Sequence, residues 1–135
     1  MTAKEFMEKV RQAESELRLI NKKRLHYQEL ATSIGVKLTG MPGGQKGGSM
    51  VETGAVAIVD LMAELDAKEK EYTAVVKKAE GLISKIRQEK FRKILTLRYI
   101  TGCSWKIIRD EMEYKDEKSV YRCHGYALRE LQKVM

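Results

Sequence analysis

The stretch ILTLRYITGCSWKIIRDEMEYKDEKSVYRCHGYALRELQ, residues 94–132, decides the fold class of this chain. Its apolar residues recur at helical spacing, and the repeat is broken twice by short polar or glycine-containing turns. Ser104 precedes the middle helical segment and is a suitable N-cap. The predicted elements are a helix over 90–100, a glycine turn, a short helix over 104–112, a polar turn over 113–119 and a final helix over 119–134. No alternating strand pattern occurs in the chain, so the sequence predicts an all-α fold.

The final predicted helix has two faces of different character. Its apolar face carries Val120, Ala127, Leu128 and Leu131, and its polar face carries Arg122, Tyr126, Arg129 and Lys133. Three helices joined by turns of this length are typical of a helix-turn-helix unit, whose last helix enters the major groove of DNA. The side chains at the start of such a helix contact base edges, and here they are Lys118, Ser119, Tyr121 and Arg122. Tyr126, Arg129 and Lys133 would reach the phosphate backbone. Periodicity alone equally allows a basic face that contacts only solvent.

The distribution of charge is informative about the partner of this region. The chain has 26 basic and 19 acidic residues, which gives a net charge of +7. Residues 85–135 contain 13 of the basic and 7 of the acidic residues, so they hold six of the seven excess positive charges. A charge needed only for solubility would be spread more evenly. The asymmetry favours double-stranded DNA as a partner of the C-terminal third.

Two apolar stripes with alternating steps of four and three residues precede this third. The first comprises Phe6, Val10, Ala13, Leu17, Ile20 and Tyr27, with Arg24 in one slot. The second comprises Ile58, Leu61, Leu65, Tyr72, Val76, Ala79, Ile83 and Ile86, with Glu69 in one slot. They predict two long helices, which either pair as an antiparallel hairpin or form an oligomerising arm with another subunit.

Residues 35–54 separate the stripes and hold seven of the ten glycines and the only proline. This composition predicts a flexible loop. The predicted organisation is an N-terminal helix over 1–34, the glycine-rich loop over 35–54, a second long helix over 55–89 and a helix-turn-helix module over 90–135.

The sequence gives little support for a disulfide scaffold, a zinc site, a membrane span or an active site. The two cysteines, Cys103 and Cys123, are too few for a disulfide scaffold and indicate a reducing compartment. Together with His124 they offer three zinc ligands, whereas a structural zinc site needs four. No window approaches the roughly 18 apolar residues of a membrane span. We expect a cytoplasmic protein that is not an enzyme and binds no metal, cofactor or membrane.

Residues 94–132 resemble region 4 of sigma-70-type transcription factors. The matching positions are Leu95, Leu97, Arg98, Tyr99, Gly102, Ser104, Ile107, Val120, His124, Ala127, Leu128 and Leu131. The chain is more similar still to phage late-gene transcriptional regulators of the ArpU and RinA kind. The residues that carry this similarity are Arg98, Tyr99, Ile100, Gly102, Ser104, Trp105 and Ile108. The resemblance implies a core of Leu95, Leu97, Tyr99, Ile107, Ile108, Met112, Val120, Ala127 and Leu131, with Trp105 on or beside it.

The resemblance implies a sequence-specific DNA-binding regulator that activates late or packaging genes of a bacteriophage or prophage inside a bacterial host cell. Host RNA polymerase is a further candidate partner, and the N-terminal helices are candidates for forming a homo-oligomer. Two alternatives stay open. A small terminase subunit would recognise packaging-site DNA as a ring-shaped oligomer, and a helical adaptor would bind RNA polymerase or another regulator without contacting DNA.

Overall fold

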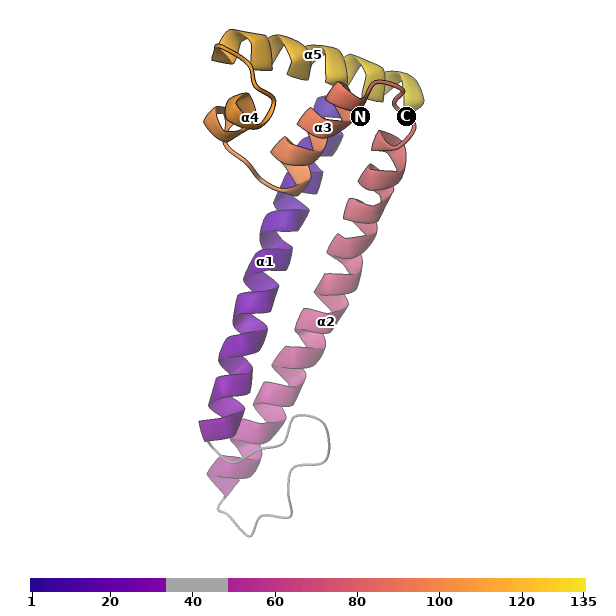
Figure 1. Cartoon of the computed structure of the whole chain (residues 1–135). Coiled ribbons are helices and arrows are strands. Elements are labelled where there is room, and N and C mark those ends of the chain that lie inside the picture. The colour runs from indigo at the N-terminus through magenta and orange to yellow at the C-terminus, as the bar shows by residue number, and fades with distance from the viewer. Residues whose placement is uncertain (34–48) are drawn as a thin grey trace. The chain divides into compact units, whose positions relative to one another are not determined.

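The computed structural model describes residues 1–33 and 49–135, and all regular structure in these residues is helical. The elements are α1 (Ala3–Ser33), α2 (Ser49–Ile83), α3 (Glu89–Leu95), the π-helix η1 (Thr96–Ile100), α4 (Trp105–Glu111) and α5 (Glu117–Val134) (Figure 1). The predicted all-α fold, with a long helical hairpin followed by shorter C-terminal helices, is confirmed. None of the described helices is long and apolar enough to cross a membrane.

The second long helix differs from the predicted span of 55–89. Residues 49–54, assigned to the glycine-rich loop by composition, belong to α2, and the remainder of that loop lies outside the described residues. The helix also ends earlier, at Ile83. There the backbone tightens, because the amides of Lys85 and Ile86 each bond a carbonyl three residues back. Ile86 is nevertheless buried, so the apolar repeat continues past the end of the helix.

The described chain forms two compact units. The hairpin unit comprises Leu17–Glu71, and the terminal unit comprises Met1–Glu16 together with Tyr72–Met135. Each unit therefore contains a part of α1 and a part of α2.

In the hairpin unit, the residues that interrupt the two stripes bind each other. Arg24 donates to Glu69 Oε2 at 2.6 Å and to Asp66 Oδ1 at 2.7 Å. These ion pairs hold the pKa of Arg24 above its usual value, mainly through the hydrogen bond to Glu69. The antiparallel pairing within one chain is confirmed. Leu61, predicted on the stripe, is exposed.

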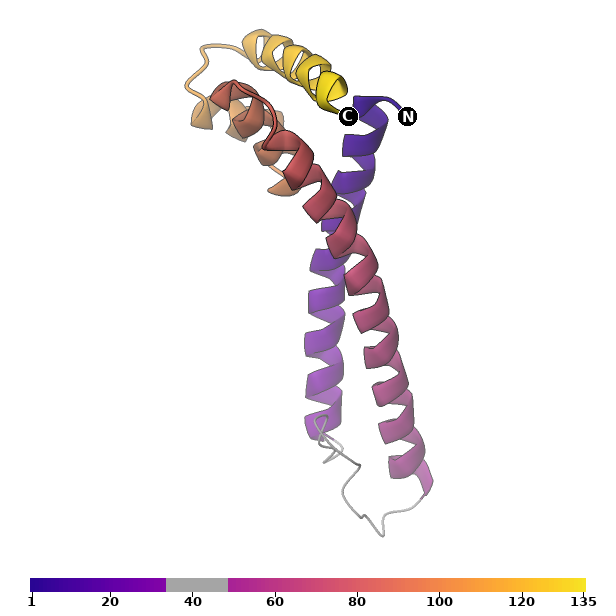
Figure 2. The same ribbon diagram turned by 90° about the vertical axis from the view of Figure 1, so that its right-hand side faces the viewer.

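In the terminal unit, the beginning of α1 is tied to the end of α5. Thr2 and Glu5 form a capping box, in which each side chain accepts from the other residue's amide at 3.2 Å. The Ala3 amide donates to Gln132 Oε1 at 2.7 Å. The two chain termini consequently lie side by side, as Figure 2 shows.

Most of the predicted C-terminal core is buried. The fully buried members are Leu95, Tyr99, Ile108, Val120, Ala127 and Leu131, while Leu97 and Met112 are half-buried. Ile107 is 49% exposed, so its assignment to the core is wrong. Consecutive helical residues point about 100° apart, and α4 turns Ile108 rather than Ile107 towards the core. Phe91 and Ile94 of α3, which the resemblance did not assign to the core, are also buried.

The turns on either side of α4 have defined caps. Gly102 adopts a positive φ of 79° before α4, which glycine tolerates without strain. Ser104 is the N-cap, as predicted, and its side chain accepts from the Ile107 amide at 3.3 Å. After α4, the amides of Glu113 and Tyr114 bond the carbonyls of Asp110 and Arg109, the pattern of a Schellman motif.

Glu113 occupies the position of that motif where glycine is usual, with a φ of 58°. Replacing it by glycine should remove the steric penalty of a side chain in this conformation. We expect Glu113→Gly to raise the free energy of unfolding by up to about 1 kcal/mol. Thermal denaturation followed by circular dichroism measures the change, with Glu113→Ala as the control that keeps the strain. A glycine variant no more stable than the alanine variant would contradict this account.

Candidate nucleic-acid interface

Helix α5 begins at Glu117, before the predicted start at residue 119. Asp116 is its N-cap, and one carboxylate oxygen accepts from both the amide and the hydroxyl of Ser119 at 2.9 Å. These hydrogen bonds hold the pKa of Asp116 below its usual value. The predicted polar turn is therefore shorter than its composition indicates, because its last residues already form the first turn of the helix.

The apolar face of α5 packs against α3 and α4 and fixes the orientation of the helix. Its buried residues are Val120, Cys123, Ala127 and Leu131. Successive residues of a helix point about 100° apart, so the side of α5 opposite this face can be read from the sequence. Going around the helix, that side begins at Gln132, passes Gly125 and ends at Lys133. That outward face carries Lys118, Arg122, Arg129 and Lys133, all exposed, and no acidic residue.

The predicted site residues lie on three different sides of α5. The four basic residues of the outward face form the first group. Arg129 lies over the ring of Tyr126, with its guanidinium carbon 5.6 Å from the ring centroid. Lys133 forms an ion pair of 3.0 Å with Glu130, although its side chain remains 72% exposed. Because exposed ion pairs of this kind are weak, Lys133 stays available to another anion.

Tyr121 forms the second group, on the flank of α5 that faces α4. Its ring meets Trp105 edge to face at 5.2 Å, and its hydroxyl donates to Glu117 Oε2 at 3.2 Å. The ring is 46% exposed. Tyr121 is therefore held in place by a neighbouring helix, beside the outward face rather than at its centre.

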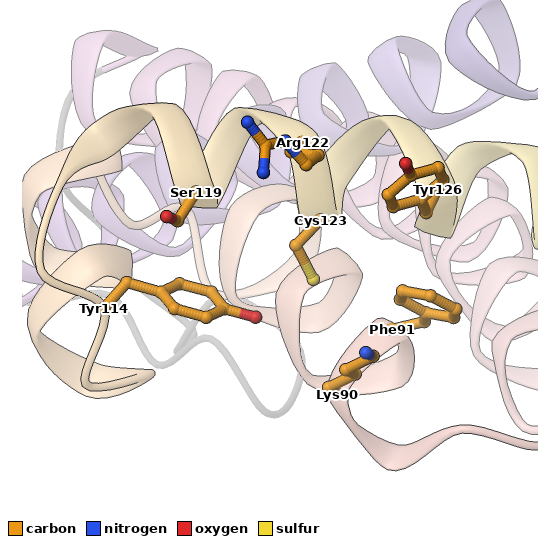
Figure 3. A pocket seen from close by; sticks show the side chains of 7 residues that line it. All are labelled: Lys90, Phe91, Tyr114, Ser119, Arg122, Cys123 and Tyr126. Atoms are coloured by element: carbon orange, nitrogen blue, oxygen red, sulfur yellow. The ribbon is translucent and has the colours of Figure 1, made fainter.

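Ser119 and Tyr126 form the third group, on the flank that faces α3. With Arg122 they border a cavity of about 230 Å³ between the two helices (Figure 3). The rest of its lining consists of Lys90 and Phe91 from α3, Tyr114 from the turn before α5, and Cys123. Tyr114 reaches into this cavity, with its hydroxyl directed towards the middle of the lining (Figure 3).

Next to Tyr121, the buried Tyr99 and the half-buried His124 begin a polar cluster at the edge of the core. The Tyr99 hydroxyl and His124 Nε2 are 2.6 Å apart. Burial first, then the charges of Arg98 and Lys4, lower the pKa of His124 to about 4. Burial raises the pKa of Tyr99 to about 12. At neutral pH the phenol and the imidazole are therefore both uncharged, and the imidazole tautomer decides which of them donates.

Trp105 completes this cluster beside the core, as predicted. Its ring packs edge to face on His124 at 4.8 Å. The guanidinium carbon of Arg98 lies 4.1 Å from the Trp105 centroid, and Arg98 also donates to the Cys103 carbonyl at 3.3 Å. Trp105 therefore packs against both Arg98 and His124 within the terminal unit.

Metal-ligand geometry is not found in the described part of the chain, where no three His, Cys, Asp or Glu side chains converge. Cys123 is buried and Cys103 is half-buried, and both are free thiols. Neither family models, nor curated proteins, nor solved structures give a match to this chain.

Three residues beside the predicted site were missed by the sequence interpretation. Lys90 and Tyr114 lie on other elements, so helical periodicity within α5 could not associate them with it. Gly125 did carry a signal, because a glycine in the middle of a helix is unfavourable by about 1 kcal/mol relative to alanine. A Cβ atom at Gly125 would meet no other atom within 4 Å, so the fold itself does not require glycine there.

The low pKa of His124 makes stability depend on pH. Because the unfolded state binds this proton with an ordinary pKa of 6.5, stability is complete above that pH and falls as the pH drops towards 4. At about 1.4 kcal/mol per pKa unit the loss is at most about 3 kcal/mol, and solvent screening of the half-buried imidazole makes it smaller. Chemical denaturation at several pH values should show it, and His124→Gln, which keeps an acceptor for Tyr99, should flatten the profile. Equal slopes for both proteins would contradict the assignment.

Proposed function

We propose that this protein binds double-stranded DNA through the outward face of α5 and regulates transcription. The observation that carries the proposal is the separation of the two faces of this helix. Val120, Ala127 and Leu131 are completely buried, whereas the opposite face presents four basic side chains. A helix held rigidly by its apolar face, with an exposed cationic face, has the form that major-groove recognition requires.

The electrostatics of the outward face support nucleic acid over a neutral partner. Its side chains can neutralise several phosphates, and each neutralised phosphate releases bound counterions. Arg122 lies one turn from the helix start, where a guanidinium can form a bidentate contact with guanine. Arg129 lies two turns further on and suits a backbone contact.

The arrangement of α4, a capped turn and α5 supports a helix-turn-helix as the structural basis. Trp105 and Tyr121 couple the two helices through their rings at 5.2 Å. The resemblance to sigma-70 region 4 and to phage late-gene regulators supports a role at promoters, with late or packaging genes of a phage or prophage as targets. On this proposal, host RNA polymerase is a second partner.

The hairpin unit supports the proposed homo-oligomer. It exposes several large apolar side chains, the most exposed being Leu25 at 58% and Val56 at 55%. Leu19, Leu30 and Val59 are exposed as well. Exposed apolar side chains on a hairpin whose stripes are already paired are suited to contact with a second copy of the chain.

Arg122 and Arg129 should differ when each is replaced by alanine. Arg122→Ala should cost about 1–3 kcal/mol on the specific site and relax preference at one or two base pairs. Arg129→Ala should weaken specific and non-specific binding about equally and lower the salt slope by roughly one. Selection of bound fragments identifies the site, and competition between specific and random duplexes then measures both effects.

Both variants should remain folded, because neither arginine lies on the buried face. Unchanged circular dichroism and thermal unfolding are the controls. If both substitutions lower affinity uniformly across sequences, α5 contacts only the backbone and promoter recognition by this helix is wrong. If the wild-type chain binds no duplex at low salt, the proposed function itself is wrong.

Gly125 provides a second test, because glycine permits close approach of a helix backbone to a ligand. Gly125→Ala should raise the free energy of unfolding by up to about 1 kcal/mol. The same variant should lower DNA affinity by about threefold or more. The matched control is Gly81→Ala in α2, where a Cβ atom also meets nothing within 4 Å, and which should stabilise the fold without changing DNA affinity. Equal DNA affinities of the two variants would show that the DNA stays clear of α5 at this position.

A further inference from the structure

The cavity between α3 and α5 is positively charged, whereas the cavity next to it contains carboxylates. Its lining includes the cations Lys90 and Arg122, the hydroxyls of Tyr114, Ser119 and Tyr126, and no carboxylate (Figure 3). The cavity on the other side of Lys90, about 400 Å³ in volume, has three carboxylates, Glu89, Glu111 and Glu113, against the two cations Lys90 and Lys93. An anion is therefore favoured in the first cavity and disfavoured in the second.

The two cations of the first cavity have no carboxylate within ion-pair distance in the described part of the chain. In residues 1–33 and 49–135, neither Lys90 nor Arg122 forms an ion pair. The Lys90 ammonium lies 5.2 Å from the centroid of the Phe91 ring, a contact that leaves its hydrogen-bonding capacity unused. The Lys90 ammonium can therefore bind an anion that enters from solvent, with Arg122 as a second cation at the border of the cavity.

The hydroxyl groups of the lining differ in what they can contribute. Ser119 already donates to Asp116, so its proton is committed. A hydrogen bond with the Cys123 thiol, then burial, raises the pKa of Tyr114 to about 12, and like an ordinary tyrosine this phenol is uncharged at physiological pH. Tyr126 is 47% exposed at the rim, where its hydroxyl can donate to a ligand.

We propose that this cavity receives a backbone phosphate of the bound DNA, with Lys90 as its principal charge and Tyr126 and Arg122 at the rim. The inference rests on the proposed DNA binding, because the cavity adjoins the outward face of α5 through Arg122. A helix in the major groove is bordered by phosphates on both sides, and contacts to them set its register. Lys90 thereby extends the interface from α5 to α3 and becomes a positioning residue.

Lys93 provides a matched control on the same helix. It carries the same charge as Lys90, but its ammonium donates to the Glu111 carbonyl at 3.3 Å and it lines the carboxylate-rich cavity. Lys90 and Lys93 both line the carboxylate-rich cavity, so the two alanine variants change the net charge equally, but only Lys90→Ala removes a cation from the first cavity. Lys90 and Lys93 are both exposed, so neither truncation should unfold the chain.

The experiment measures binding of the full chain to a mixed-sequence duplex by fluorescence anisotropy between 50 and 200 mM salt. Lys90→Ala should weaken binding several-fold at 50 mM and lower the salt slope by about 0.9, the value for one phosphate. The ratio of the wild-type affinity to the Lys90→Ala affinity should therefore fall about threefold between 50 and 200 mM salt. Lys93→Ala should stay within about twofold of the wild type, as expected for a cation outside the interface. Lys90→Arg should retain the wild-type salt slope.

The outcomes separate this inference from the proposed function. If the wild type binds DNA and the two alanine variants bind equally well, the phosphate position is wrong and DNA binding by α5 stands. If Lys90→Ala lowers affinity without changing the salt slope, Lys90 supports the fold and contacts no phosphate, which also overturns the inference. If inorganic phosphate stabilises the wild type but not Lys90→Ala against unfolding, and both proteins bind the duplex with the same affinity, the cavity binds a free anion. That result overturns the inference that it receives a DNA phosphate. Absence of any duplex binding by the wild type would remove both proposals.

Discussion

Burial of the apolar face of α5 is the interaction on which the arrangement of the candidate interface depends. Val120, Ala127 and Leu131 have no exposed surface, and α3 and α4 supply the side chains against which they pack. Because side chains project from a helix at fixed angles, seating this face also determines the direction of every other residue on α5. Core packing thus fixes the direction of the cationic outward face, so the helix backbone would lose little conformational entropy in the proposed binding to DNA.

The polar residues inside the terminal unit strengthen that arrangement. An uncharged His124 shares a hydrogen bond with Tyr99, and the Trp105 ring contacts both the imidazole and Arg98. Among the described residues no buried side-chain nitrogen or oxygen atom lacks a hydrogen-bond partner. A network in which every buried polar group has a partner favours one packing arrangement, because a rearrangement would leave a polar group without a hydrogen bond. The cluster therefore holds α4 and α5 together while its own polar atoms remain committed to one another.

The hairpin unit is organised by a different balance of forces. Its stripes bury apolar residues such as Ile20 and Leu65, and Arg24 interrupts one stripe opposite the carboxylates of the other. Partly exposed ion pairs add little stability, but a mismatch in register would leave Arg24 against apolar side chains. The charged positions therefore contribute to the choice of register, while apolar burial supplies the stability of the pair.

Sequence periodicity alone determined the helical class, the two apolar stripes and the two faces of α5. Those features depend on spacing within a single helix, and that spacing is local. The N-cap at Ser104 was predictable for the same reason, since a cap is formed by residues a few positions apart. The ends of α2, the start of α5 and the exposure of Ile107 were not predictable, because turns and neighbouring helices decide them. Tertiary structure alone brought Lys90 and Tyr114 to the flank of α5, since the packing of α3 and the turn against α5 joins residues whose proximity no repeat along the chain encodes.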